Sequence, residues 1–223
     1  MKVGVIGLGV MGKNHARVLS NMPSVTELVL YDPLGADLGL VHGVQVESNI
    51  DNFLNQEMDY CVISSPTSTH LEMGLRLASR KIATLIEKPL ASNEADGLKL
   101  VEAFFKAGVI AGVGHVDRFN PAIMAMKEKL QAGVLGSVYQ ISTRRVGPYS
   151  GRIRDVGVVK DLASHDIDLV GWLSESNYES LNSRTLRPMG SEHEDILLAI
   201  GTLGNGSLVS HLVNWISPIK ERV

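Results

Sequence analysis

The sequence predicts an α/β chain in two parts: a doubly wound parallel sheet, then an α+β domain whose sheet is open and mostly antiparallel. Two observations predict this. Up to about residue 114, short apolar runs alternate with amphipathic helical patterns, which is typical of β-α-β units. In the second half, apolar runs follow one another with few helices between them, which indicates antiparallel pairing. We therefore predict one domain over 1–117 and a second over 118–223.

The composition bounds the class of protein. The 223 residues are 44% hydrophobic and 20% charged, as in a globular chain with a sizeable core. The formal net charge of −3 gives the chain no excess of positive charge, so we expect neither nucleic acid nor a membrane as a partner. The single cysteine, Cys61, lies in an apolar run, and residues 1–7 resemble a strand rather than a secretory signal. We expect a cytoplasmic protein.

The elements follow in order along the first part. Its strands are β-branched or aliphatic runs, and apolar-periodic stretches between them predict helices. The expected strands are KVGVIG, ELVLYD, YCVISS, IATLIE and VIAGVG, and the expected helices span 11–21, 69–80 and 92–107.

In the second part we expect helices over 121–132 and through KDLASHDIDL, residues 160–169. The expected strands are SVYQISTRR, ESLNSRTLR, EDILLAIGTL and GSLVSHLVNW, with a tight hairpin turn at Gly204 to Gly206. About four strands make a thin sheet with an edge that needs a cover. We therefore expect a domain that is short at its C-terminal end, covered by partner subunits or by chain beyond this sequence.

A glycine pattern predicts a dinucleotide site. Gly7, Gly9 and Gly12 form G-x-G-x-x-G directly after the first expected strand. In a Rossmann fold the first glycine permits the turn, the second admits the pyrophosphate, and the third lets the helix pack closely. Val10 and Met11 begin the helix whose N-terminal N–H groups would face the phosphates.

Asp32 ends the second expected strand, 20 residues beyond Gly12. At that spacing a carboxylate accepts hydrogen bonds from the adenosine ribose and repels a 2′-phosphate. We therefore expect NAD rather than NADP as the cofactor. The alternative is a glycine turn that only packs against the sheet.

The segment SSPTSTH follows the third expected strand, at the sheet edge where ligands of parallel sheets bind. Ser65, Pro66 and Thr67 are expected to contact the cofactor. His70 begins the next helix, where it either contacts the ligand or caps and packs that helix.

The segment LIEKPL ends the next expected strand. Glu87 and Lys88 directly follow the apolar run, and Pro89 stops the strand. A cis bond before that proline would redirect Lys88. A lysine at this edge would reach the nicotinamide, with Glu87 also near the cofactor. The alternative is an ordinary surface Glu-Lys pair.

The segment KDLASHDIDL places polar groups in apolar surroundings. At 100° per residue, Asp161, His165, Asp168 and Trp172 share one narrow stripe, which flanking leucines would half-bury. We expect Asp168 to bind backbone or an arginine. Taken alone, an Asp and a His four residues apart are explained by a helix start and an ion pair.

Together, GVIGLGVMGKNHARVL, EKPL and DLASHDIDL resemble the glucose-fructose oxidoreductase, inositol dehydrogenase and rhizopine-catabolism (Gfo/Idh/MocA) family over essentially the whole chain. The resemblance implies NAD(P)-dependent oxidoreduction, a Rossmann domain, and a second domain whose open sheet builds homo-oligomers. It also implies that Lys88, Asp161 and His165 are the catalytic group, and we expect no metal ligands. The chain departs from the family at Ala163, where glycine is usual, and relatives continue beyond SPIKER.

Within that family, GHVDRFNPAI and VGPYSGRIRDVGVVKDLASHDIDL look most like dehydrogenases that oxidise the 3-hydroxyl of UDP-N-acetylhexosamines. Guanidinium groups suit a diphosphate, and Arg144, Arg145, Arg152 and Arg154 lie near the expected catalytic helix. Surface solvation is the alternative for each. The residues that we expect at the substrate are Arg118, Asn120, Arg152, Arg154 and His165.

The expected activity is that of an NAD-dependent sugar or nucleotide-sugar dehydrogenase. His165 would act as general base, Asp161 would hold its tautomer, and Lys88 would donate a hydrogen bond to the reacting oxygen. The alternative from another class is an NAD-binding regulatory or scaffold protein without turnover. Some relatives open glycosidic bonds or reduce C=N or C=C bonds, so fold and motif leave the reaction open.

Overall fold

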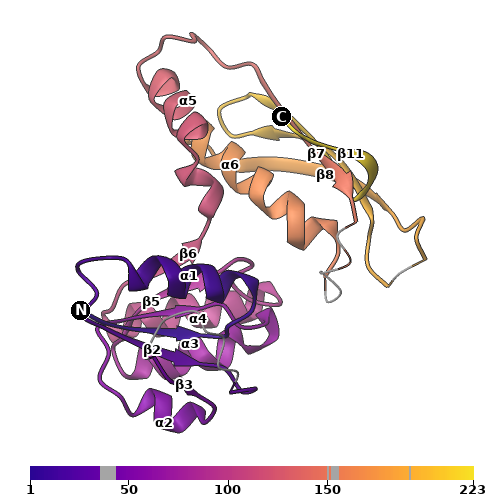
Figure 1. Ribbon diagram of the computed structural model, residues 1–223. Coiled ribbons are helices and arrows are strands. Elements are labelled where there is room, and N and C mark those ends of the chain that lie inside the picture. The colour runs from indigo at the N-terminus through magenta and orange to yellow at the C-terminus, as the bar shows by residue number, and fades with distance from the viewer. Residues whose placement is uncertain (36–43, 150, 152–155, 191) are drawn as a thin grey trace. The chain divides into compact units, whose positions relative to one another are not determined.

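The structure is a computed structural model in which residues 1–35, 44–149, 151, 156–190 and 192–223 are described (Figure 1). The chain divides into two compact units, Met1–Gly114 and His115–Val223. The predicted class is confirmed, because a parallel sheet is followed by a mixed, mostly antiparallel one.

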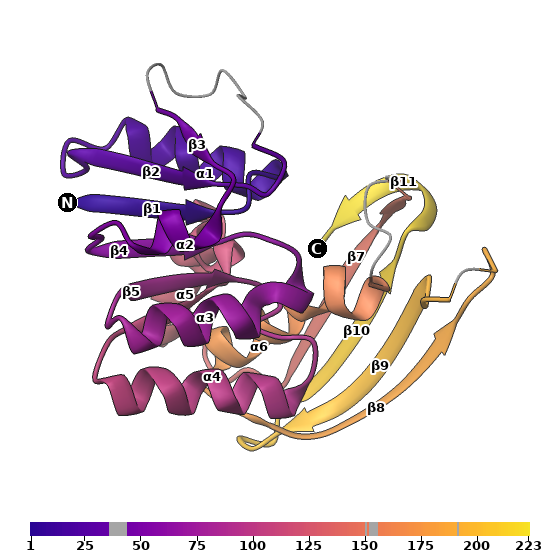
Figure 2. The ribbon, with the colours of Figure 1, turned by 90° about the horizontal axis from the view of Figure 1, so that it is seen from below.

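The first unit contains six parallel strands in the order β3-β2-β1-β4-β5-β6 (Figure 2). The order changes direction between β1 and β4, so their carboxyl ends border the crevice in which such sheets bind ligands. The strands are β1 (Lys2–Ile6), β2 (Glu27–Tyr31), β3 (Val46–Glu47), β4 (Tyr60–Ile63), β5 (Ala83–Glu87) and β6 (Ala111–Gly114).

Helices pack on both faces of this sheet. Val5 and Val62 form a buried cluster with α1, whereas Ile6 and Ile63 form another with α2, α3 and α4. Val5 and Ile6 are adjacent on β1 and face opposite sides, as the two-residue period of a strand requires. The helices are α1 (Val10–Ser20), α2 (Ile50–Leu54), η1 (Thr67–Thr69), α3 (His70–Ser79) and α4 (Glu94–Ala107).

The second unit contains a five-stranded sheet in the order β11-β7-β10-β9-β8. Only the β7–β10 pair is parallel. The predicted hairpin between β9 and β10 is present, with a positive φ of 85° at Gly206. The elements are η2 (Val116–Phe119), α5 (Pro121–Gln131), β7 (Gln140–Pro148), η3 (Val159–Ala163), α6 (Ser164–Ser174), β8 (Tyr178–Leu186), β9 (Ile196–Leu203), β10 (Leu208–Asn214) and β11 (Ile216–Arg222).

One face of this second sheet is covered and the other is open. Leu197 and Ala199 on β9 are buried in a cluster that includes Val158 and the η3 residue Ala163. Leu198 and Ile200, which alternate with them, are 54% and 60% exposed. The open face therefore carries apolar side chains.

Several stretches differ from the sequence-based expectations, and β3 and α2 lie where no element was expected. Val159–Ala163 form a π-helical turn rather than the first turn of an α-helix, so Asp161 does not follow the 100° spacing assumed for its stripe. The strand β11 was missed, because Pro218 interrupts its pattern and charged residues end it. None of the helices in the described part of the chain has the length and apolarity to cross a bilayer.

Candidate active site

The glycine turn between β1 and α1 has the geometry that a pyrophosphate needs. Gly7 has a φ of 85°, which a side chain would strain. A Cβ on Gly12 would lie 1.8 Å from the Gly7 carbonyl oxygen, whereas a Cβ on Gly9 would meet no atom within 4 Å. The turn is thus open beside Gly9, where Val10 and Met11 begin α1. These residues fit a dinucleotide at the helix N-terminus.

Asp32 is bonded to the same turn. Its Oδ2 accepts the backbone N–H of Leu8 at 2.8 Å, and its Oδ1 accepts that of Leu34 at 3.0 Å. Each carboxylate oxygen can accept a second hydrogen bond, so contact with ribose hydroxyls is compatible with these bonds. Asp32 therefore also fixes the turn, a role that the sequence did not indicate.

The segment after β4 lies beside the glycine turn. A Cβ on Gly7 would meet the backbone of Ser65 at 2.6 Å. The hydroxyl of Ser65 lies 2.6 Å from that of Thr69, and Pro66 and Thr67 lead into η1. The first unit thus brings this expected cofactor segment and the glycine turn to one edge of its sheet.

His70 joins two loops at that edge. Its side chain is 1% exposed. Nε2 lies 3.0 Å from the carbonyl oxygen of Ser65, and Nδ1 lies 3.1 Å from that of Pro89. This burial favours packing over ligand contact, and it connects the segment after β4 with the segment after β5.

A buried carboxylate precedes the lysine at the end of β5. Oε1 of Glu87, whose side chain is 10% exposed, lies 2.7 Å from Nε2 of His15 on α1. Its Oε2 accepts the backbone N–H of Lys88 at 3.3 Å, and the Lys88–Pro89 peptide is cis. His15, which the sequence analysis missed, therefore connects the glycine helix to the strand end that carries Lys88.

In the second unit, a chain of charged side chains leads to His165. Nδ1 of His165 lies 3.3 Å from Oδ2 of Asp117, and that oxygen lies 2.8 Å from Nη2 of Arg145. Arg145 is 8% exposed and also contacts Oδ1 of Asp166, through Nε at 2.8 Å and Nη2 at 2.7 Å. A carboxylate on Nδ1 favours the tautomer with a lone pair on Nε2. Nε2 can therefore act as a base.

Asp117 is the carboxylate at Nδ1 of His165, and its charge state decides what it can do there. Burial raises the pKa of Asp117, but the positive charges of His165, Arg145 and Arg222 lower it more strongly, so the pKa lies below its usual value. Asp117 is therefore ionised at neutral pH and can stabilise an imidazolium.

A second ion pair lies one turn further along α6. Arg118 donates through Nε to Oδ2 of Asp168 at 2.8 Å, and Nδ1 of His115 lies 3.3 Å from that oxygen. The Arg118 guanidinium also lies 5.9 Å from the centre of the Trp172 ring. The expectation that Asp168 binds an arginine is confirmed. Asn120, expected at the substrate, caps α5 with its side-chain oxygen.

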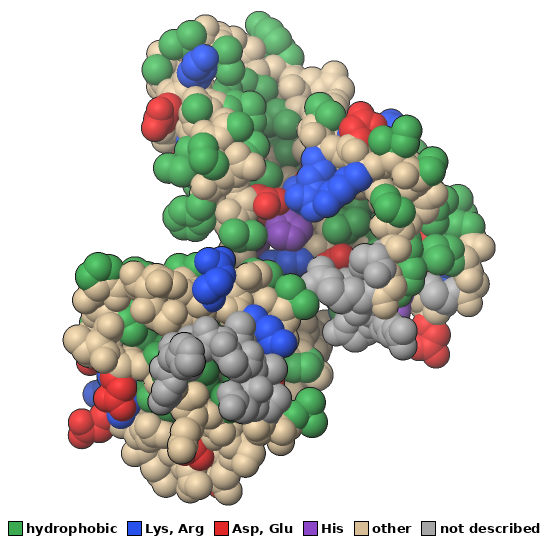
Figure 3. Space-filling model, viewed as in Figure 1, with side chains coloured by type: hydrophobic (Ala, Val, Ile, Leu, Met, Phe, Trp, Pro, Cys, Tyr) green, Lys and Arg blue, Asp and Glu red, His purple; other side chains and the backbone are tan. Residues whose placement is uncertain are grey.

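Asp161 lines a pocket of about 350 Å³ between η3 and the strands β7 and β11. Lys220 and Arg222 line it as well, together with the aromatic side chains of Tyr149 and Trp215. On the second unit, Figure 3 shows basic side chains gathered beside histidine and acidic side chains. The pocket therefore joins a candidate catalytic carboxylate to two cationic groups.

Two of the four arginines expected near the catalytic helix are described, and their surroundings differ. Arg145 is enclosed by carboxylates, and Arg144 pairs with Glu221 at 2.8 Å, with both side chains solvent-accessible. Arg152 and Arg154, expected at the substrate, lie outside the described residues.

Comparison with known proteins decides the family. Residues 1–115 match the model of an oxidoreductase family with an NAD-binding Rossmann fold, and residues 123–223 match the GFO/IDH/MocA C-terminal domain. The chain belongs to the GFO/IDH/MocA family. NAD is its cofactor, as the glycine turn and Asp32 predicted.

Relatives in the GFO/IDH/MocA family act on different compounds. The chain is 30% identical to inositol 2-dehydrogenase 2 of Saccharopolyspora erythraea, over 94% of this chain and 65% of that protein. It is 26% identical to UDP-N-acetylglucosamine 3-dehydrogenase of Acidithiobacillus ferrooxidans, over 94% and 66%. It therefore spans less than two thirds of either relative.

The same fold is found in a crystal structure of the WlbA dehydrogenase from Bordetella pertussis in complex with NADH and UDP-GlcNAcA. The TM-score is 0.86 at 22% identity, and the match covers 98% of this chain and 72% of that chain. This similarity concerns the GFO/IDH/MocA fold alone.

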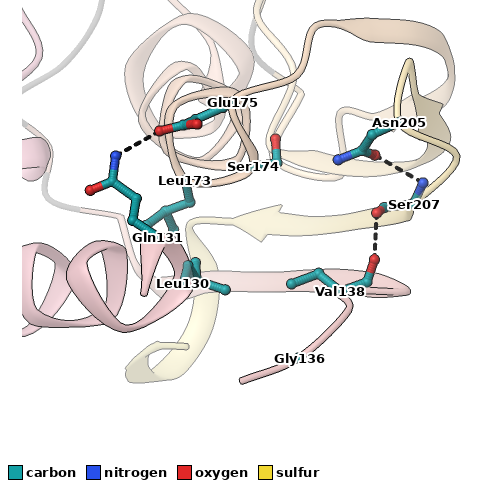
Figure 4. Close-up of a pocket in the computed structure, with 9 residues that line it drawn as sticks. All are labelled: Leu130, Gln131, Gly136, Val138, Leu173, Ser174, Glu175, Asn205 and Ser207. Carbon is teal, nitrogen blue, oxygen red and sulfur yellow. Dashed lines mark hydrogen bonds between the residues drawn. The ribbon is translucent and has the colours of Figure 1, made fainter. Parts of the chain in front are cut away.

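A second pocket of about 230 Å³ lies between the C-terminal ends of α5 and α6 and the β9–β10 turn (Figure 4). There Gln131 donates to Oε1 of Glu175 at 2.7 Å, and Ser207 donates to the carbonyl oxygen of Val138 at 2.6 Å. None of the expected site residues lines this pocket. Within the described residues, no three or more His, Cys, Asp or Glu side chains gather as a metal site.

In this GFO/IDH/MocA chain, four residues at these sites had no signal of their own in the sequence: His15, Asp117, Lys220 and Arg222. Two of them stand next to expected residues: His15 follows Gly12 by three positions, and Asp117 directly precedes Arg118. Adjacency marks such residues as candidates, but it does not identify the partner that each contacts.

Proposed function

We propose that this NAD-binding oxidoreductase is a dehydrogenase that transfers a hydride between a secondary hydroxyl of a sugar or nucleotide sugar and NAD. The NAD-binding domain supports the proposal, as does the array of the second unit in which Asp117 contacts His165 and Arg145 contacts Asp117. Two relatives also support it, since one is named for inositol and the other for UDP-N-acetylglucosamine.

Each candidate residue has one task in this reaction. NAD, when bound, supplies the nicotinamide that accepts the hydride. Nε2 of His165 takes the hydroxyl proton, and Asp117 stabilises the resulting imidazolium through Nδ1. We assign Lys88 a hydrogen bond to the same substrate oxygen, where it stabilises developing negative charge, and Asp161 a contact with the substrate in its pocket.

The contact between His165 and Asp117 carries the proposal. An NAD-binding scaffold needs the glycine turn but has no use for an imidazole held by a carboxylate. The array behind that imidazole includes Arg145, and burying such charges costs desolvation free energy. A catalytic base at His165 accounts for these buried charges, because they orient the imidazole and stabilise its protonated form. A scaffold protein would not need them.

A screen of NADH formation by absorbance tests the proposal. The compounds are UDP-N-acetylglucosamine, its galacto epimer, myo-inositol and free hexoses, each with NAD⁺. We expect turnover of at least one, and we expect His165→Ala to lower kcat by about 10²-fold to 10⁴-fold while NAD affinity stays unchanged. NAD binding without turnover of any compound would instead favour a regulatory or scaffold protein.

Among these compounds we favour the UDP-N-acetylhexosamines, oxidised at the 3-hydroxyl. The segments GHVDRFNPAI and VGPYSGRIRDVGVVKDLASHDIDL support this choice, because they look most like dehydrogenases of that class. A kcat/KM at least tenfold higher for myo-inositol than for either nucleotide sugar would contradict it.

We also propose that the open face of the second sheet forms homo-oligomers in the cytoplasm. Leu198, Ile200 and Leu208 are each more than half exposed there, and burying apolar area gains about 25 cal/mol per Å². The buried, unpaired thiol of Cys61 supports a reducing compartment. Leu198→Lys should lower the mass measured by light scattering without changing the circular dichroism, and an unchanged mass would argue against this interface.

A further inference from the structure

The pocket beside Asp161 has two walls of different character. One wall is apolar and aromatic, with the rings of Tyr149 and Trp215 packed at a centroid distance of 4.9 Å. The other wall carries cationic side chains from β7 and β11. Its volume of about 350 Å³ falls in the lower part of the range for small-molecule sites, about 300–1,000 Å³.

Arg145 does not supply the charge of this pocket, because Asp117 and Asp166 both hold its guanidinium. Lys220 and Arg222 are exposed, and neither makes an ion pair or a side-chain hydrogen bond within the described part of the chain. Two cationic groups therefore remain available at the pocket wall.

The strand β11 directs these two groups to one face. Arg222 lies opposite Arg145 in the β7–β11 pairing, so both side chains lie on the same side of the sheet. Lys220 comes two residues earlier and shares that side. Glu221, between them, pairs instead with Arg144 on the other face. The strand thus presents its cations to the pocket and its carboxylate away from it.

Gly147 on β7 leaves room for this arrangement. A Cβ at Gly147 would lie 3.5 Å from Cγ of Lys220, so the stem of Lys220 lies along the glycine. Lys220 thus lines the pocket although it is exposed. Like charges at Arg145 and Arg222 would repel each other across the strands, and the carboxylate of Asp117, which interacts electrostatically with both, offsets this repulsion.

We propose that Lys220 and Arg222 bind an anionic group of the substrate, a phosphoryl or a carboxylate, beside Asp161. The inference rests on the proposed function, since Asp161 belongs to the catalytic group assigned there. It deepens that function, because a neutral polyol such as myo-inositol has no charge for the pair to bind. Charge-assisted hydrogen bonds to such oxygens are short and strong.

Direct binding to the full chain, measured by calorimetry in saturating NAD⁺, tests the inference. The probes are UDP for a phosphoryl group, glucuronate for a carboxylate, and myo-inositol as the neutral compound. The variants are Lys220→Met and Arg222→Met. Arg144→Met is the matched control, because it removes a cation of the same sheet from the opposite face. Circular dichroism confirms that each variant folds.

We expect UDP or glucuronate to bind, with a Kd about tenfold weaker in Lys220→Met and in Arg222→Met and unchanged in Arg144→Met. The probe that responds identifies the anionic group as phosphoryl or carboxylate. Equal binding of both probes to all variants would overturn the inference. That outcome would leave the dehydrogenase intact. Anion binding through Lys220 without NADH formation from any compound would instead support the pocket and refute the dehydrogenase.

Discussion

Replacing Asp117 by Asn tests whether its carboxylate holds and charges His165. Asn keeps the size of the side chain but cannot stabilise an imidazolium by charge. Because Asp117 favours the protonated ring, its loss should lower the pKa of His165. The acid limb of the kcat profile, where rate is lost as the base becomes protonated, should therefore move to lower pH. The plateau should also fall, because a weaker base removes a proton more slowly.

The magnitude follows from the geometry of the array. At 3.3 Å, and with an effective dielectric constant of about 20, the attraction between carboxylate and imidazolium is about 5 kcal/mol. Water at the partly exposed Asp117 side chain screens this attraction, and only a fraction of a change in basicity appears in the rate of proton removal. We expect a net loss of about 1.4 kcal/mol, which is about tenfold in kcat at the plateau.

The assay is kcat against pH with the best substrate of the screen, together with titration of the His165 ring by NMR. Asp168→Asn is the matched control, because Asp168 lies one turn further along α6 and binds Arg118 and His115. A purely structural effect of losing a carboxylate would move both variants alike. A profile of Asp117→Asn that superimposes on the wild-type profile, or an equal shift in Asp168→Asn, would refute the assigned pair.

The remaining predictions concern both units. Gly12→Ala should destabilise the first unit by about 1–3 kcal/mol in urea unfolding, because its Cβ meets a carbonyl at 1.8 Å. Gly9→Ala should instead keep that stability and weaken NADH binding measured by fluorescence, and equal stability losses would contradict the assigned turn. His15→Ala should cost about 1–3 kcal/mol because Oε1 of the buried Glu87 carboxylate loses its His15 partner, and an unchanged midpoint would refute the pair. Burial lowers the pKa of His211 from its usual value of 6.5, and the opposing effect of Asp166 is smaller. The unfolded chain therefore binds the proton more readily than the folded protein. The free energy of unfolding should fall as the pH drops below about 6.5. His211→Gln should reduce that pH dependence. Burial also raises the pKa of the Cys61 thiol, so a thiol reagent should react only after unfolding, and prompt reaction of the native protein would contradict that burial.

The local part of the cofactor site could be predicted from the sequence. The turn from Gly7 to Gly12 and the strand end at Asp32 are fixed by spacing, because one β-α-β unit contains them and its geometry is nearly invariant. The structure adds bonds across that unit, such as the one from Leu8 to Asp32. The sequence alone could not indicate that bond, since it depends on the backbone path of the turn.

The π-helical turn shows where periodicity fails. A constant 100° per residue placed Asp161 and His165 on one stripe, but Asp161 lies in a wider turn that precedes α6. His165 and Asp168 follow the expected spacing and both contact residues of η2. A π turn has no sequence signature comparable to a glycine or proline, so only the three-dimensional structure revealed it.

Long-range ion pairs were beyond prediction for a different reason. Asp117 and His165 are separated by 48 positions along the chain, and His15 and Glu87 by 72. Each residue alone has a simple interpretation as a solvated charge. Its partner is set by how strands and helices pack, which one sequence does not determine.

The ion pairs of Arg145 connect the His165 imidazole to the second sheet through Asp117 and Asp166. Nη2 of Arg145 contacts both Asp117 and Asp166, and Arg145 belongs to β7. Asp166 is adjacent to His165 on α6, so the same guanidinium restrains the helix and the carboxylate that binds the ring. A shift of α6 relative to β7 would therefore disrupt the contact between Arg145 and Asp166. Because a buried guanidinium that loses one carboxylate is left with uncompensated charge, such a shift is strongly disfavoured. The position of the base is thereby coupled to the packing of the second unit.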